Sequence, residues 1–266
     1  MARREYYLVD PADIHYRYSG KKKEASTLIL RQQEHRHLSR VLRHRPGDEV
    51  QVTDGKGCMY TCVIEDIRRD ESMLRITSVV LEAGEPRFLE LTLAQAIPRE
   101  NRFDWVLEKG TEIGLRAFIP MLCARGDVTP REQKQKRWHR VLTSAVKQCG
   151  RSRVPQVYAP ASFEQVIAES TAFDLLWIAH LPLPEKAETA ARRQPSFPAV
   201  DDVRSGLLLV GPESGFTEQE VSMAQQAGFT FLDLGPRRLR SETAGIIAAA
   251  VLLEQFGELA GTPQSG

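Results

Sequence analysis

The chain has 266 residues, of which 27% are charged, and its net charge is only +1, so total charge gives no indication of a nucleic-acid partner. No apolar run approaches the length that spans a membrane, and the four scattered cysteines are too few for a disulfide framework. A chain of this length can form one large domain or two smaller ones, each with a substantial core. We therefore expect a cytoplasmic protein with reduced thiols.

Short strands and turns dominate residues 1–82. The dipeptide Asp54-Gly55 is a strong hairpin signal between two segments with strand character, 49–53 and 59–64. Residues 73–80 alternate between polar and apolar side chains well enough for a further strand. The pattern predicts a small β-barrel.

A basic segment interrupts these strands at residues 31–45, where five arginines and three histidines accompany one acid. Leu38, Val41 and Leu42 have helical spacing, so a short helix could anchor on them and present its arginines outward. Arginine suits phosphate recognition better than lysine does, which favours RNA contact over a merely solvated charged face. No metal site is expected at the neighbouring histidines, because no cysteine or acid pair accompanies them. The predicted RNA-binding residues here are Arg36, Arg40 and Arg43.

A polar linker at residues 82–87, broken by glycine and proline, separates this part from a second unit. Beyond it the pattern predicts a strand at 89–97, a helix at 102–114 and a strand at 117–122. Strand, helix and strand at this spacing indicate a parallel α/β layout. A long basic helix is predicted at 131–149.

The last third of the chain contains two copies of one motif, an apolar strand followed by a Gly-Pro turn and then a helix. The first copy joins 207–210 to Gly211-Pro212-Glu213-Ser214-Gly215, and the second joins 231–234 to Gly235-Pro236-Arg237-Arg238. A continuous apolar run of this kind predicts a buried strand in a parallel sheet. Open parallel sheets bind ligands at the carboxyl ends of their strands, and an earlier strand predicted at 174–180 ends there in His180.

The two Gly-Pro loops differ from a phosphate-binding loop. No Gly-Lys-Ser/Thr follows the first one, and the carboxylate of Glu213 would repel a phosphate. Such loops suit a neutral or cationic small molecule held by main-chain groups, with the arginines of the second loop beside it for an anionic polymer. Ser241 is predicted as the N-cap of a helix that ends near Phe256 and is apolar almost all round, which places it in the core or at a dimer face.

Gly211-Pro212-Glu213-Ser214-Gly215-Phe216 and the segment 234–244 (LGPRRLRSETA) resemble the signature of the SPOUT methyltransferases. More narrowly, they resemble the bacterial family that methylates N3 of one uridine in small-subunit ribosomal RNA. That family's pattern reads GPEGG and LRTET, so Ser214 stands for a glycine and Ser241 for a threonine. The segments 37–43 and 148–155 are also similar to the family.

The resemblance implies a PUA-like β-barrel that binds RNA at residues 1–82 and a SPOUT methyltransferase domain with a deep trefoil knot at residues 83–266. It implies S-adenosylmethionine as the cofactor, small-subunit ribosomal RNA as the partner, free or within the assembled 30S subunit, and a homodimer. Arg151, Arg153, Arg237 and Arg238 are further RNA-binding candidates. The implied cofactor-binding residues are Ile178, Ala179, His180, Leu209, Gly211, Pro212, Glu213, Gly215, Leu234, Gly235, Leu239, Arg240, Thr243 and Ala244.

Methylation of N3 requires that a weakly acidic position lose its proton and attack the methyl group. The reaction needs a general base or a cation that stabilises the uracil anion. Arg240 is the candidate cation, and Glu242 or Glu213 is the candidate base, although each acid could equally be structural. Because N3 faces the partner base in a duplex, the target must be unpaired or flipped out. A SPOUT enzyme with another RNA target and a non-catalytic RNA-binding module are the alternatives.

Overall fold

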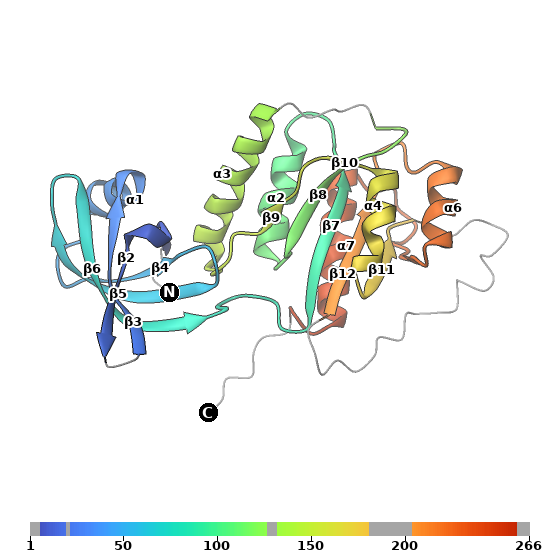
Figure 1. Cartoon of the computed structure of the whole chain (residues 1–266). Coiled ribbons are helices and arrows are strands. Elements are labelled where there is room, and N and C mark those ends of the chain that lie inside the picture. The colour runs from blue at the N-terminus through green and yellow to red at the C-terminus, as the bar shows by residue number, and fades with distance from the viewer. Residues whose placement is uncertain (1–5, 20–21, 127–131, 181–203, 260–266) are drawn as a thin grey trace. The chain divides into compact units, whose positions relative to one another are not determined.

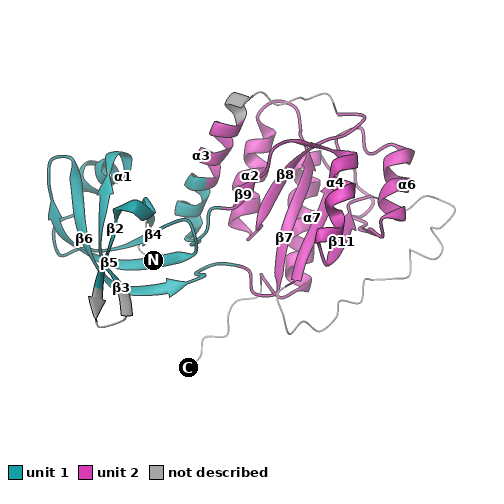
Figure 2. Ribbon diagram, in the orientation of Figure 1, with its two compact units in different colours: residues 1–85, 143–154 teal, residues 86–142, 155–266 magenta. Residues whose placement is uncertain are grey.

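The computed structural model describes residues 6–19, 22–126, 132–180 and 204–259 (Figure 1). The chain divides into two compact units, which are residues 1–85 with 143–154 and residues 86–142 with 155–266 (Figure 2). Helix α3 (Glu132–Cys149) contributes residues to both. Residues 185–205 have the sequence of a variable connector, and 185–203 lie outside the described residues.

Unit 1 is built on a six-stranded mixed sheet with the order β1-β4-β5-β6-β3-β2. Its neighbouring strands are antiparallel except β1 and β4, which are parallel. The predicted hairpin is confirmed, because Thr53 pairs with Met59 around a turn in which Gly55 has φ +69°. The strands are β1 (Tyr6–Leu8), β2 (Ile14–Ser19), β3 (Lys22–Arg31), β4 (Glu49–Thr53), β5 (Cys58–Ile67) and β6 (Glu71–Leu81), with a 3-10 turn η1 (Pro11–Asp13).

The basic segment forms a short helix α1 (Gln32–Arg36) followed by one π-helical turn, η2 (His37–Val41). Leu38 is fully buried in the core of unit 1, as predicted, but Val41 is 65% exposed, so its predicted anchoring role is wrong. A π-helical turn holds one residue more than an α-helical turn, which rotates Val41 away from the sheet. Leu42 packs against the same core, as predicted. His35 is also buried, and its Nδ1 lies 2.8 Å from the hydroxyl of Ser72.

Unit 2 contains a parallel sheet with the order β10-β8-β7-β12-β11-β13, and β9 pairs with β8. Every pair in it is parallel, which confirms the predicted α/β layout. The strands are β7 (Leu89–Ala96), β8 (Ala117–Leu122), β9 (Gln156–Val157), β10 (Ala161–Ser162), β11 (Leu175–Ile178), β12 (Arg204–Val210) and β13 (Thr230–Phe231). The helices are α2 (Arg102–Glu112), α3, α4 (Phe163–Glu169), α6 (Glu218–Gln226) and α7 (Ser241–Gln255), with a 3-10 turn η3 (Ser170–Ala172).

Helices cover both faces of this sheet (Figure 1). On one face Leu207 and Leu209 of β12 share a core cluster with Phe163 of α4 and Val221 of α6. On the other face α7 packs against β7, β12 and α2. Because β12 is covered on both sides, all of 206–210 is buried, and the strand has a continuous apolar sequence rather than an alternating one.

The second predicted strand, 231–234, is shorter than expected. Only Thr230–Phe231 pairs as β13, with one further main-chain bond from Leu232 to the carbonyl of Ile178 at 2.9 Å. The carboxylate of Asp233 then accepts the N–H of Gly235 at 2.8 Å. This local turn draws the chain out of the sheet before Leu234 can join it.

The described residues contain neither a disulfide nor a helix with the length and hydrophobicity of a membrane span. All four cysteines are free thiols. Burial raises the pKa of the Cys62 and Cys123 thiols to about 12, so both stay protonated at neutral pH. A protonated buried thiol is a poor nucleophile, and these two residues therefore serve as packing groups.

Candidate functional site

Three adjacent parallel strands, β12, β11 and β13, end at the same edge of the unit 2 sheet. Ile178 at the end of β11 pairs with Leu209 on one side and with Phe231 on the other. The loops that follow these strands therefore converge: 179–180, the first Gly-Pro loop at 211–217, and the second Gly-Pro loop at 232–240. This edge is where an open parallel sheet binds its ligand.

The converging loops enclose a cavity of about 230 Å³, called here the loop cavity. Its wall combines main-chain groups of both Gly-Pro loops with the apolar side chains of Phe216 and Leu232. Gly215 and Gly235 have φ of +73° and +88°, a backbone conformation that residues other than glycine rarely adopt. Predicted site residues that line the cavity are Ala179, His180, Gly211, Pro212, Glu213, Gly215, Leu234, Gly235, Arg237, Arg238, Leu239 and Ala244.

The other predicted residues lie beside the cavity rather than in its wall. Ile178 and Leu209 are fully buried in their strands, and Arg240 is exposed at the start of α7. Glu242 and Thr243 belong to the first turn of α7. The predicted cofactor-binding set omits five residues that do line the cavity, Val210, Ser241, Phe216, Leu232 and Asp233. The last two fall in the run that was predicted to be a strand, which concealed them.

A chain of hydrogen bonds ties α7 to the first Gly-Pro loop. The hydroxyl of Ser241 donates to the carbonyl of Gly211 at 2.7 Å and accepts from Nε2 of Gln95, on β7, at 2.7 Å. Ser241 is thus the first residue of α7 and not its N-cap, a position that Arg240 holds without a side-chain cap. The predicted capping role is wrong because the Ser241 hydroxyl bonds to the first Gly-Pro loop and not to the N–H groups of its own helix. Gln95 is fully buried, so this link is shielded from water.

Replacement of Ser241 by alanine is expected to weaken binding of a ligand in the loop cavity about tenfold. The loss would remove the hydroxyl that joins the carbonyl of Gly211 to the amide of Gln95 and so holds the first Gly-Pro loop in place, an effect of about 1–3 kcal/mol. Isothermal titration with S-adenosylmethionine measures the change. The variant Ser241→Thr keeps the hydroxyl and is the matched control; equal affinity of the alanine and threonine variants would contradict the role of this link.

One arginine that the sequence interpretation missed stands between the two predicted acids. Nη1 of Arg102 lies 3.7 Å from Oε1 of Glu213 and 3.8 Å from Oε1 of Glu242. The carboxylate of Glu242 is largely buried, and its Oε2 has no hydrogen-bond partner among the described residues. Arg102 begins α2 directly after the loop that leaves the carboxyl end of β7, and β7 pairs with β12. A place just after the carboxyl end of a strand beside β12 is the sequence signal that could have identified Arg102 as a site residue.

Two more arginines hold the first Gly-Pro loop from outside. Nη2 of Arg238 donates to the carbonyl of Glu213 at 3.1 Å and so joins the two Gly-Pro loops. Nη1 of Arg125 donates to the carbonyls of Ser214 and Phe216, each at 3.3 Å. The hydroxyl of Ser214 returns a bond to the carbonyl of Arg125 at 3.1 Å. The serine at this position therefore links the loop to the end of β8.

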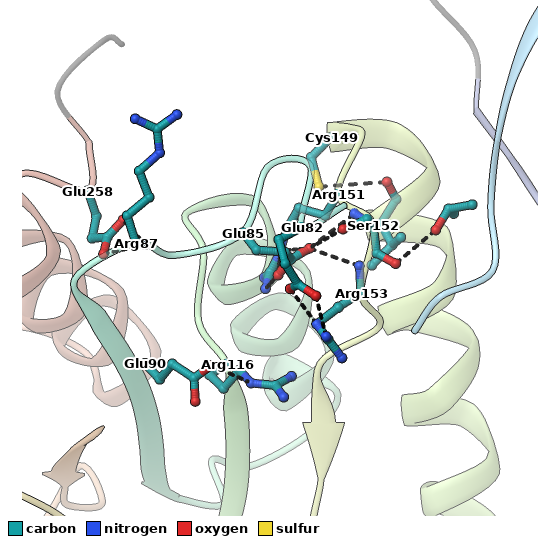
Figure 3. Close-up of polar contacts among 12 residues, drawn as sticks. Glu82, Glu85, Arg87, Glu90, Arg116, Cys149, Arg151, Ser152, Arg153 and Glu258 are labelled. Atoms are coloured by element: carbon teal, nitrogen blue, oxygen red, sulfur yellow. Dashed lines mark hydrogen bonds and ion pairs between the residues drawn. The ribbon is translucent and has the colours of Figure 1, made fainter. Parts of the chain in front are cut away.

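The predicted RNA-binding arginines of unit 1 fall into two classes. Arg36, Arg40 and Arg43 are exposed on α1 and the residues that follow it, as the helical spacing predicted. Arg151 is instead 3% exposed, with Nη2 2.6 Å from Oε2 of Glu85. Arg153 is paired with the exposed Glu82 (Figure 3). Burial assigns Arg151 to the internal structure of unit 1 rather than to the predicted RNA contact.

In the described part of the chain no group of His, Cys, Asp and Glu has the arrangement of a metal site.

Comparison with known proteins gives consistent matches. The RNA methyltransferase domain family matches residues 85–253, and the RNA methyltransferase PUA domain family matches residues 30–76. Ribosomal RNA small subunit methyltransferase E of Bacillus subtilis is 31% identical over 250 residues, which are 90% of this chain and 94% of that protein. The protein of the same name from Synechocystis is 35% identical over 230 residues, covering 85% of this chain and 72% of that protein.

Two solved structures resemble the whole chain. The structure of ribosomal RNA small subunit methyltransferase E from Neisseria gonorrhoeae bound to S-adenosyl methionine has 26% sequence identity and a TM-score of 0.77, and the match covers 95% of this chain and 98% of that one. The structure of a putative methyltransferase from Legionella pneumophila in complex with the cofactor SAM has 27% identity and a TM-score of 0.75, with coverage of 96% and 98%.

Proposed function

Because this chain belongs to the family of ribosomal RNA small subunit methyltransferase E, we propose that it transfers a methyl group from S-adenosylmethionine to N3 of a uridine in small-subunit ribosomal RNA. The observation that supports this most directly is the loop cavity at the carboxyl ends of β11, β12 and β13. The chain is accordingly an S-adenosylmethionine-dependent RNA methyltransferase with a PUA part and a methyltransferase part.

The residues of the loop cavity fit this cofactor. Its main-chain groups at Gly211, Leu234 and Leu239 suit the adenine and ribose, and Phe216 and Leu232 offer apolar surface to the ring. The cavity wall also contains the carboxylates of Glu213 and Asp233, which suit a cationic ligand and would repel a phosphate. When bound, S-adenosylmethionine supplies an electrophilic methyl group on a positively charged sulfur.

The chain's own residues must remove and compensate charge at the uracil ring. We assign Arg240 as the cation that stabilises the anion left when N3 loses its proton. Glu242 is the stronger candidate for the base, because its Oε2 is buried and lacks a hydrogen-bond partner among the described residues. Glu213 is the second candidate, and Arg102, close to both acids, offsets their negative charge.

We propose that residues 1–82 act as the RNA-binding domain and residues 83–266 as the methyltransferase domain. Exposed Arg36, Arg40 and Arg43 would contact phosphates of the RNA. The trefoil knot and the exact RNA substrate, free or within the assembled 30S subunit, remain predictions from the family. A ribosomal RNA substrate favours the cytoplasm as the site of action.

A homodimer is part of the same proposal. The face of α7 that turns away from the sheet exposes Ile247 and Val251, which are 41% and 38% exposed and lie one helical turn apart. Two apolar side chains at this spacing on a helix beside the loop cavity are what a second copy of the chain would cover.

Isothermal titration of the purified protein with S-adenosylmethionine is expected to show saturable binding at about one site per chain. The same preparation, given small-subunit ribosomal RNA and methyl-labelled cofactor, is expected to label one uridine, which mass spectrometry of RNA digests identifies. The demethylated product, S-adenosylhomocysteine, serves as a competing ligand in the control titration. A folded protein that neither binds the cofactor nor labels RNA would overturn the proposal.

A further inference from the structure

Two hollows continue from the loop cavity across the surface of unit 2. The first, of about 640 Å³, shares Pro212, Glu213 and Arg238 with the loop cavity. The second, of about 340 Å³, shares Ile97 and Glu100 with the first. The shared residues make a continuous path that leads away from the cofactor site. Its lining contains six arginines, which define what we call the arginine groove: Arg99, Arg102, Arg125, Arg137, Arg140 and Arg238.

The parallel sheet explains why these arginines meet. Arg99 and Arg102 follow the carboxyl end of β7, and Arg125 follows the carboxyl end of the adjacent β8. Arg238 belongs to the second Gly-Pro loop, at the same edge of the sheet. Arg137 and Arg140 come from α3, beside the start of α2. The groove therefore gathers charge from four segments that are far apart in the sequence.

The groove has an excess of positive charge, because its lining contains six arginines and only three carboxylates, Glu100, Asp104 and Glu213. Asp104 forms an ion pair with Arg137, whose Nη2 lies 2.5 Å from Oδ2 of Asp104. Arg125 and Arg238 donate to main-chain carbonyls of residues 213–216, which orients each guanidinium without neutralising it. Arg140 is exposed, and its Nε donates to the carbonyl of Lys136 in its own helix at 3.4 Å.

When the methyl acceptor is a base within an RNA strand, the sugar-phosphate backbone of that strand must also come close to the cofactor site. A uridine that meets the methyl group at the mouth of the loop cavity is covalently continuous with its neighbours, so their phosphates must lie along an adjoining surface. Arginine is the side chain best suited to phosphate, because its planar fork donates two parallel hydrogen bonds. Trp138 and Phe103 of the second hollow are almost fully buried, so the groove offers charge rather than stacking platforms.

We propose that the arginine groove binds the phosphate backbone of the RNA strand that carries the target nucleotide, and that Arg125 and Arg140 hold phosphates at successive points along it. The inference rests on the proposed methyltransferase function and extends it, since it adds an RNA-binding surface on the catalytic unit to the arginines of unit 1. Recognition through the backbone is independent of base sequence, so the groove positions the strand and leaves selection of the uridine to other contacts.

The test uses the full chain and the variants Arg125→Ala, Arg140→Ala and the double variant. Arg116→Ala is the matched control: Arg116 precedes the opposite end of β8 and pairs with Glu90 (Figure 3). Binding of a short single-stranded RNA with one uridine is followed by fluorescence anisotropy at several salt concentrations. Each single groove variant is expected to bind about tenfold more weakly and to reduce the magnitude of the slope of log K against log salt by about 0.7. The double variant is expected to combine both losses, whereas Arg116→Ala matches the wild type.

Three controls separate the possible outcomes. Titration of every variant with S-adenosylmethionine detects damage to the first Gly-Pro loop, and Arg125→Lys restores the charge at that position. If the wild type transfers methyl groups but the double variant has the same RNA affinity and salt slope as Arg116→Ala, the proposed role of the groove is wrong and the proposed function still holds. Polyglutamate that competes as well as RNA of equal charge would also overturn it. Failure of the wild type to bind the cofactor contradicts the proposed function itself.

Discussion

Replacement of Arg240 by alanine is expected to lower the rate of methyl transfer at saturating cofactor and RNA about 100-fold. Removal of one preorganised group that stabilises charge in a transition state has an effect of this size. Arg240 lies directly before Ser241, whose side chain lines the loop cavity, and its own side chain is exposed at the edge of that cavity. Single-turnover transfer of labelled methyl groups to small-subunit ribosomal RNA measures the rate.

Cofactor binding separates this role from a structural one. Arg240 does not line the loop cavity, so the alanine variant should bind S-adenosylmethionine with the affinity of the wild type. The variant Arg240→Lys keeps the positive charge and should recover part of the rate. Normal cofactor binding together with an undiminished transfer rate would remove Arg240 from the mechanism, and Arg102 would become the first alternative cation because of its position beside both acids.

Replacement of Glu85 by alanine is expected to destabilise unit 1 by about 3–5 kcal/mol, because it removes the carboxylate that pairs with the buried guanidinium of Arg151. The side chains of Glu85 and Arg151 are each 3% exposed. The carboxylate also accepts the main-chain N–H groups of Ser152 and Arg153, at 3.0 and 2.8 Å (Figure 3). One side chain thus organises the turn that follows α3.

The neighbouring pair provides the control. Glu82 is 51% exposed and pairs with Arg153, so Glu82→Ala should cost at most about 1 kcal/mol. Hydrogen exchange of amides in β4 and β5 reports on unit 1, whereas Trp105, Trp138 and Trp177 all belong to unit 2, so their fluorescence follows unit 2 separately. Equal protection of β4 and β5 in the two variants would contradict the central role of Glu85.

Much of the site could be predicted because its signals are local. Strand β12 is a continuous apolar run that ends in Gly-Pro, and its pairing, burial and loop agree with that pattern. The Thr-x-x-Glu pattern from Thr217 to Glu220 is typical of a capping box, and the Glu220 N–H does donate to the Thr217 hydroxyl at 3.2 Å. Neither feature needs a partner far along the chain, so neighbouring residues are enough to specify it.

Residues that act through distant partners were missed or misplaced. Gln95 is one of the polar residues of β7, and only the fold reveals its bond to Ser241, 146 positions later. Arg102 was placed at the start of a predicted helix, but its position beside Glu213 and Glu242 depends on three separate segments. No periodicity or turn signal encodes such a meeting.

The order of the residues was sufficient for the α/β architecture, the two Gly-Pro loops and the family, since apolar periodicity, turn residues and motifs act over a few positions. The folded chain alone decided what each charged residue does. Arg151 and Arg125 are both arginines near the end of an element, yet Arg151 is buried against Glu85 while Arg125 lines an open groove. The physical reason is that the role of a charge depends on its desolvation and its partners, and both are set by segments far away in the sequence.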